Sequence, residues 1–285
     1  MNKQGLVYCI NPEQYDIFDA RINKPICIKN IENGVEKGSM VFQEMDEINF
    51  RKNQLSYFPP NNVALLLSVN KKHLEKAIEL FDEQINPNKV NHSFVETKTD
   101  KKKFLKEKSK IVADYIELIQ TSIVFGYTTL EAFANLSIPI DYEYLVTIKN
   151  KGIKEVYDKN AIERWINLGE KLSKILPGIY ETKKIEKEKF WSYFIKLEKL
   201  RNEIIHQKSI TRTEFYKQYF RKDIFNICNV PELVIKFYYE ANYKKQKINP
   251  LWPWLINKGK EFPITTDFKS ENFEVIGNLF EGKKK

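Results

Sequence analysis

Short apolar runs alternate with polar turns in the first third of the chain, and this pattern changes near residue 100. Runs bounded by Asn, Gly and Pro predict strands at Leu6–Ile10, Ile26–Ile28 and Val41–Phe42. The longer apolar run Val63–Val69 predicts a buried strand. It is followed by Lys71–Gln84, where apolar residues recur every three or four positions and predict a helix.

Beyond residue 104 the apolar residues keep the three-or-four spacing of helices that bury one face. Pro139 and Pro177 mark the ends of two such helices, because proline interrupts the helical hydrogen bonds. Asn160 suits the N-terminal capping position of one helix, and Pro231 suits the first position of another. Helices are therefore predicted over residues 104–138, 160–176, 186–206 and 231–243.

These patterns predict an α+β fold in three parts. Residues 1–95 are expected to form a mixed α/β domain that acts as a sensor, a specificity element or a dimerisation element. The charged stretch 86–103 is the predicted linker, and 104–245 the predicted helical bundle. Residues 246–285 are expected to pack on the bundle as a C-terminal extension. Its Trp252-Pro253-Trp254 suits that packing or a stacking platform for nucleic-acid bases.

Composition indicates a folded protein with an anionic partner. The chain has 285 residues, of which 42% are hydrophobic and 30% charged, a balance typical of globular proteins rather than disordered ones. Its net charge of +9 favours RNA, DNA or an anionic surface, since phosphates attract lysine and arginine irrespective of sequence. A solvated lysine-rich surface would give the same charge.

Several functional classes lack support in the sequence. No apolar run has the length of a membrane span or signal peptide, which predicts a cytoplasmic protein without a membrane partner. Cys9, Cys27 and Cys228 are far apart and form no Cys-x-x-Cys pair, so reduced thiols are expected rather than a zinc site. With no glycine-rich phosphate loop and no metal-ligand spacing, no cofactor is expected.

Candidate chemistry gathers at the end of the helix predicted over 186–206. Arg201 is permanently cationic, and His206, one of three histidines, can take and give a proton near neutral pH. Together they suit phosphoryl chemistry on a polyanion. The alternative is structural, because cationic residues also favour the negative end of a helix dipole.

The helical positions of these residues restrict how they can act. Arg201 and His206 lie about 140° apart on a helical wheel, whereas Asn202 and His206 share a face. Arg201 falls within the apolar stripe, where an unpaired charge is costly. We therefore expect an ion pair between Arg201 and Glu131, the one carboxylate in an otherwise apolar segment; Glu131 has either this structural role or a place in the site.

Two segments resemble a known family. Leu200–His206 is similar to the Arg-x4–6-His motif of HEPN domains, in which a polar residue commonly follows the arginine. Phe125–Asn135 resembles the first long helix of bacterial HEPN proteins from toxin–antitoxin and anti-phage loci. The resemblance covers roughly residues 104–245 and does not extend to residues 1–95.

The resemblance implies a helical bundle that forms a homodimer, with two motifs facing one cleft. Active HEPN proteins are metal-independent endoribonucleases that leave a 2′,3′-cyclic phosphate and a 5′-hydroxyl. His206 would then act as general base or acid, Arg201 would stabilise charge on the phosphorane, and Asn202 would orient His206 or hold a phosphate oxygen. The implied substrate is RNA (tRNA or mRNA), and an antitoxin or phage-derived trigger would control a toxin or defence effector.

Three points stay open at this stage. Some HEPN toxins carry a modifiable tyrosine two positions after the histidine, where this chain has Lys208, a residue suited to RNA binding. A non-catalytic HEPN module, binding or scaffolding another defence protein, is the alternative function. The aromatic and basic residues between Tyr216 and Lys222 suit an RNA-binding edge or an ordinary amphipathic helix.

Overall fold

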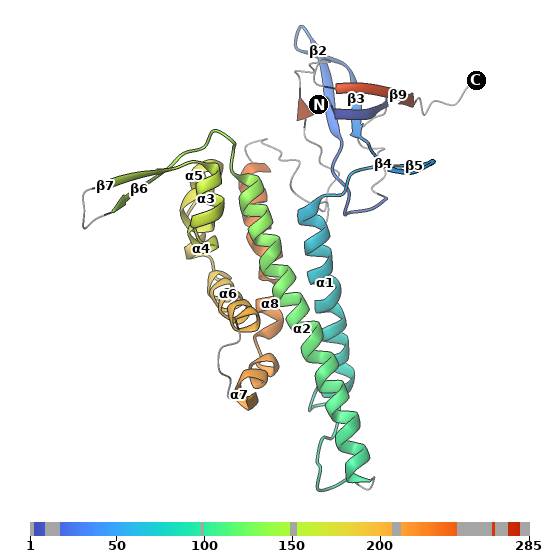
Figure 1. The fold of residues 1–285 in the computed structure, drawn as a ribbon, viewed down its shortest axis with the longest axis vertical. Coiled ribbons are helices and arrows are strands. Elements are labelled where there is room, and N and C mark those ends of the chain that lie inside the picture. Colours follow the sequence, from blue (N-terminus) through green and yellow to red (C-terminus); the bar gives the residue numbers. More distant parts are fainter. Residues whose placement is uncertain are drawn as a thin grey trace. The chain divides into compact units, whose positions relative to one another are not determined.

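The computed structural model describes residues 3–8, 18–97, 100–148, 153–206, 212–243, 264–265 and 273–279, and it confirms the α+β class (Figure 1). Its contacts divide the chain into two units. One unit combines Met1–Leu65 with Ile235–Lys285 and contains a sheet. The other, Leu66–Val234, is mainly helical and contains the Arg201 motif.

The sheet unit contains five strands in the order β8-β2-β3-β1-β9. The three N-terminal strands confirm the predicted apolar runs where these are described, and they pair antiparallel. An Asn33-Gly34 turn with positive φ at both residues (52° and 78°) joins β2 to β3, the backbone that a tight hairpin requires. The bounds are β1 Lys3–Tyr8, β2 Ile26–Glu32, β3 Val35–Glu44, β8 Ile264–Thr265 and β9 Phe273–Leu279.

The C-terminal segment, predicted to pack on the bundle, contributes strands to the sheet in its described parts. β9 runs parallel to β1, and β8 runs parallel to β2. The physical reason is that β1 and β2 would otherwise be the edges of a three-stranded sheet, with unpaired backbone groups along both sides. Trp252-Pro253-Trp254 lies outside the described residues.

The prediction of a strand at Val63–Val69 is wrong. These residues open helix α1 (Asn62–Leu80), which continues into a single π-helical stretch at Phe81–Ile85. The Asn61 side chain caps the start by accepting a hydrogen bond from the backbone of Ala64, 2.9 Å away. Before α1, β4 (Asp46–Phe50) and β5 (Asn53–Tyr57) form a separate exposed hairpin.

The helical unit is built around α2 (Lys101–Ser137), which Figure 1 shows beside α1 and α6. The predicted helix is confirmed, and it ends before Pro139. Asn70 of α1 joins three helices: its Nδ2 donates to the Ser122 backbone and hydroxyl of α2 and to the Cys228 carbonyl of α8 (2.8, 2.9 and 3.0 Å). These buried bonds place most of α1 with the bundle rather than in the predicted 1–95 domain.

The region between α2 and α6 (Trp191–Ile205) is more broken than predicted. Its single expected helix is divided, and Asp158 rather than Asn160 caps the first piece through the Ala161 backbone. An antiparallel hairpin that the sequence did not predict precedes it. In chain order the elements are β6 Tyr144–Ile148, β7 Ile153–Tyr157, α3 Lys159–Trp165, α4 Leu168–Glu170, a π-helical turn Lys171–Ile175, α5 Leu176–Tyr180 and a 3-10 turn Ile185–Lys187.

The last helices follow the motif. After α7 (Arg212–Lys217) and a 3-10 turn (Gln218–Phe220), α8 runs from Ile224 to Tyr243. Pro231 lies inside α8, whereas the sequence predicted it at the first position of a helix. Its ring packs against α2 at Gly126, where a Cβ would lie 2.9 Å from the Pro231 Cγ. Among the described residues, no helix has both the length and the apolar content of a membrane span.

Candidate functional site

The predicted motif lies at the end of α6. This helix buries Phe194, Leu197 and Leu200 in the bundle, which fixes the position of its last turn. The helix ends at His206, whose backbone N–H donates to the Asn202 carbonyl over 2.9 Å. The His206 side chain is exposed, so the imidazole of the motif faces solvent where the helix stops.

Arg201 contacts an aromatic ring. Its guanidinium carbon lies 4.8 Å from the centroid of the Tyr127 ring, and Nη1 donates to Oδ1 of Asn202 over 3.1 Å. A cation over a ring face gains electrostatic stabilisation without losing its charge. The expected ion pair with Glu131 is not formed, and the described part of the chain offers Arg201 no carboxylate within 4 Å.

Tyr127 supports Arg201 from α2. It is 5% exposed, and its hydroxyl donates to Oε1 of Glu198 over 3.1 Å. Burial, with the charges of Glu198 and Glu131 next, raises the pKa of Tyr127, and Arg201 opposes the rise only in part. The phenol therefore stays protonated and keeps donating to Glu198.

Lys171, which the sequence analysis missed, is the cation near Glu131. It is 5% exposed, and its Nζ donates to Oδ1 of Asn135 (2.8 Å) and to the Glu163 carbonyl (3.1 Å). Burial lowers the pKa of Lys171, while the charges of Glu131 and Glu163 oppose that shift. Asn135 thus bonds a buried lysine, and Glu131 acts on that lysine through its charge rather than pairing with the motif arginine.

The sequence does contain a signal for Lys171. It belongs to the same helical stripe as Leu168, Leu172 and Ile175, which are all buried. A lysine inside such a stripe must be neutralised or hydrogen-bonded, and so it predicts polar partners.

The predicted site residues therefore separate into two groups. Arg201 and Asn202 are brought together with Tyr127, but the side-chain oxygen Oδ1 of Asn202 accepts from Arg201 and does not orient the His206 imidazole. His206 stands alone at the helix end, with no side-chain hydrogen bond to any described residue. Lys208 lies outside the described residues.

The segment after the motif is attached to α6 and α2. Gln218 Nε2 donates to Glu203 Oε2 over 3.1 Å, three residues before His206. Gln120 Nε2 on α2 donates to the Tyr219 hydroxyl over 3.1 Å. Tyr219 is fully buried whereas Tyr216 is exposed, so the aromatic residues of this segment divide between core and surface.

No three His, Cys, Asp or Glu side chains of the described residues gather closely enough to hold a metal ion. No protein-family model, curated protein or solved structure matches the chain. The arrangement at the end of α6 is thus interpreted from its own chemistry: a fixed cation, an amide and an exposed imidazole within two turns of helix.

Proposed function

We propose that the end of α6 is the catalytic site of a HEPN-type, metal-independent endoribonuclease that acts in the cytoplasm as a toxin or anti-phage effector. The observation that carries this proposal is the environment of Arg201. An aromatic ring and an amide hold the guanidinium, and no described carboxylate neutralises it. Its charge is therefore available to a phosphate.

This environment suits stabilisation of a transition state. A purely structural arginine in an apolar stripe is normally paired with a carboxylate, because burial of an unpaired charge is costly. The nearby carboxylates have other partners: Glu198 accepts from Tyr127, and Glu131 lies in the field of Lys171. Stacking on a ring orients the planar fork of the guanidinium, which matches phosphate oxygens bidentately.

His206 would supply the proton transfers. In the proposed step, the imidazole takes the proton of a ribose 2′-hydroxyl while that oxygen attacks the adjacent phosphorus. The bond to the 5′-oxygen breaks, and a second imidazole, in its protonated form, gives its proton to this leaving oxygen. The products are a 2′,3′-cyclic phosphate and a 5′-hydroxyl, and DNA cannot react because it lacks the attacking group.

The separation of Arg201 and His206 around the helix favours a homodimer. About 140° apart on the wheel, the two side chains cannot easily meet on one phosphate from one copy of α6. Two copies with their α6 ends facing each other would place the arginine of one protomer beside the histidine of its partner. This arrangement would also provide the two imidazoles that the reaction uses.

Incubation of the purified full-length protein with total RNA and with tRNA, in EDTA, tests the proposal. Wild type should release fragments that end in a cyclic phosphate, while His206→Ala and Arg201→Ala should not. His92→Ala is a matched control, since His92 is an exposed loop histidine outside the Leu200–His206 motif. Arg164→Ala is another, because Arg164 also stacks on an aromatic ring, 5.0 Å from the Trp165 centroid.

The rival function, a non-catalytic binding or scaffolding module, gives a different pattern. It predicts no cyclic-phosphate ends at any protein concentration and a loss of stability for Arg201→Ala. Cleavage that survives in His206→Ala would also refute the proposal, since the activity would then belong to another site or a contaminant.

A further inference from the structure

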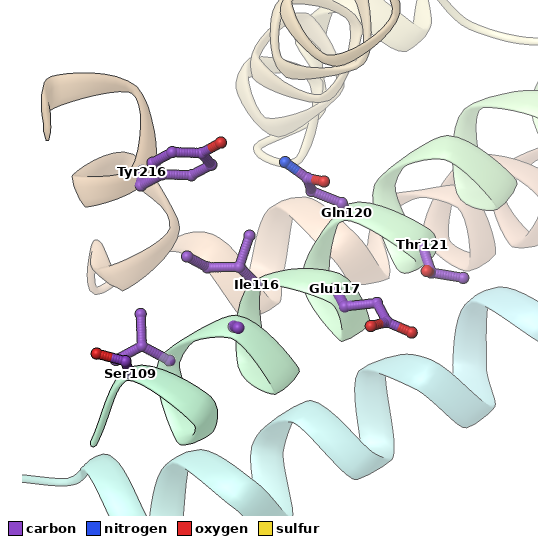
Figure 2. A pocket seen from close by; sticks show the side chains of 8 residues that line it. Ser109, Ile116, Glu117, Gln120, Thr121 and Tyr216 are labelled. Atoms are coloured by element: carbon purple, nitrogen blue, oxygen red, sulfur yellow. The ribbon is translucent and has the colours of Figure 1, made fainter. Parts of the chain in front are cut away.

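A groove of about 520 Å³ runs along α2 beside Tyr216 of α7 (Figure 2). Tyr216 of α7 forms one wall, and Val112, Ile116 and Gln120 of α2 form the floor. Figure 2 shows the Tyr216 hydroxyl directed across Ile116 toward the Gln120 amide, while Glu117 and Thr121 line the groove further from Tyr216. The groove thus sets an aromatic ring beside the aliphatic side chains of Val112 and Ile116.

The Tyr216 ring is exposed but held in place. It is 42% exposed, and it packs at a steep angle on Phe215, with ring centroids 5.2 Å apart. Phe215 in turn packs edge-on against the fully buried Tyr219 (5.7 Å). An exposed aromatic ring on a buried aromatic base is a preformed surface for stacking, because little side-chain freedom remains to be lost.

The groove also offers hydrogen-bonding groups suited to a base edge. Gln120 uses one amide N–H on the Tyr219 hydroxyl, and no described residue bonds its carbonyl oxygen. Ser109, Glu117 and Thr121 add a hydroxyl, a carboxylate and a second hydroxyl around the rim. Bases present both donors and acceptors on their Watson–Crick edges, and such mixed polar groups read unpaired bases.

Lysines extend the groove along the same helix. Lys102, Lys106 and Lys110 follow one another at four-residue steps, and Ala113 and Glu117 of the groove continue this row. All three lysines are exposed, and no described carboxylate pairs with them within 4 Å. Six of the ten residues Lys101–Lys110 are lysine, against one glutamate, so this end of α2 has a strong positive charge.

We infer that this groove binds an unpaired base of single-stranded RNA on Tyr216, with the adjoining phosphates along Lys106 and Lys110. Charge complementarity and the stacking surface favour this occupant over a protein. The inference rests on the proposed ribonuclease and names a subsite for its substrate. The groove is tied to the motif helix, since α7 continues into Gln218, which bonds Glu203 near the end of α6.

Binding can be measured without cleavage in the full-length His206→Ala background. Fluorescence anisotropy of a labelled single-stranded 12-mer RNA should show that Tyr216→Ala weakens binding roughly tenfold, while Tyr216→Phe retains affinity, because stacking needs only the ring. A blunt RNA duplex of the same length should bind with no dependence on Tyr216, since its bases are not free to stack.

The lysine row is tested by salt dependence. Replacing Lys106 and Lys110 together by Gln should make the plot of log affinity against log salt less steep by about 1.4, the contribution of two single-strand phosphates. The matched control is Lys72→Gln with Lys76→Gln, an exposed pair at the same spacing on α1. An equal change in the control would overturn the assignment, because the attraction would then be a property of the whole surface.

The inference and the proposed function can fail separately. If wild type cleaves RNA but Tyr216→Ala binds as tightly as its parent, the groove inference is overturned and the nuclease stands. If nothing is cleaved but binding still depends on Tyr216, the groove stands as an RNA site and the nuclease does not. A Tyr216→Ala effect on sedimentation alone, with RNA affinity unchanged, would identify a protein interface and overturn the inference.

Discussion

The Tyr127 ring of α2 lies under the Arg201 guanidinium of α6, with 4.8 Å between the ring centroid and the guanidinium carbon. The Tyr127 hydroxyl donates to Glu198, which precedes Arg201 by three residues on α6. One buried tyrosine therefore binds an arginine with the face of its ring and a glutamate with its hydroxyl group. It keeps the carboxylate occupied and the cation oriented. The two functions of this side chain can be separated by substitution.

Tyr127→Phe should keep the ring and lose only the hydrogen bond to Glu198, lowering the free energy of unfolding by about 1 kcal/mol with little effect on RNA cleavage. Tyr127→Leu should lower it by about 2 kcal/mol or more and also slow cleavage, because Arg201 loses its stacking surface. Urea unfolding and initial cleavage rates at a temperature where both variants are folded measure the two effects. Cleavage by Tyr127→Leu at the wild-type rate would show that the ring does not position the arginine.

Asn202→Asp should impair cleavage more than Asn202→Ala. The Asn202 side-chain oxygen Oδ1 accepts from Arg201, so a carboxylate there would form an ion pair and neutralise the cation needed by the phosphate. Alanine would merely release the guanidinium from one neutral bond. Rates for both variants, compared at equal folded fraction, distinguish this role from the orientation of His206, which predicts equal losses.

The sequence predicted the parts of the fold that have long periodic patterns. The helices around Tyr127 and Arg201 were found because their apolar residues recur at helical spacing over many turns. The run Val63–Val69 was misassigned, because a short continuous apolar run suits a strand as well as a buried helix. Its helical state depends on the Asn61 cap and on packing around Asn70, neither of which local spacing reveals.

Partner choice was the less predictable part of the site. Helix spacing places Arg201 in the apolar stripe but does not say which ring or carboxylate of α2 faces it. Glu131 lies one turn from Tyr127, so a small difference in helix position exchanges an ion pair for a stacked ring. The pairing of β9 with β1 could not be predicted from local patterns either, since nearly the whole chain separates the two strands.

Lys171 should make the free energy of unfolding depend on pH in the alkaline range. Its native pKa is below that of an unfolded lysine, 10.5, so between the two values the unfolded chain binds more protons and stability rises with pH. We expect the free energy of unfolding of wild type, relative to Lys171→Met, to increase as the pH is raised from 7 toward 10. Urea titrations across this range measure it, with Lys184→Met at an exposed position as control. A constant difference would contradict the burial argument.

Gly126→Ala should destabilise the bundle by roughly 1–3 kcal/mol, the usual result of overpacking. A Cβ there would lie 2.8 Å from Asn70 Nδ2 and 2.9 Å from Pro231 Cγ, so α1 and α8 would both have to move from α2. Gly178→Ala is the control, because its nearest foreign atom, the Tyr142 hydroxyl oxygen, is 3.7 Å away. Thermal unfolding should show a lower midpoint for the first variant and an equal or higher one for the second.

The parallel pairing of β9 with β1 has a consequence for synthesis on the ribosome. β1 is synthesised long before its neighbour β9 (Phe273–Leu279), because the whole helical unit lies between them in the sequence. The helices up to Val234 can fold while the chain grows, whereas the sheet must wait for a segment made on the order of seconds later. The sheet would thus be completed only after the helical unit has been made.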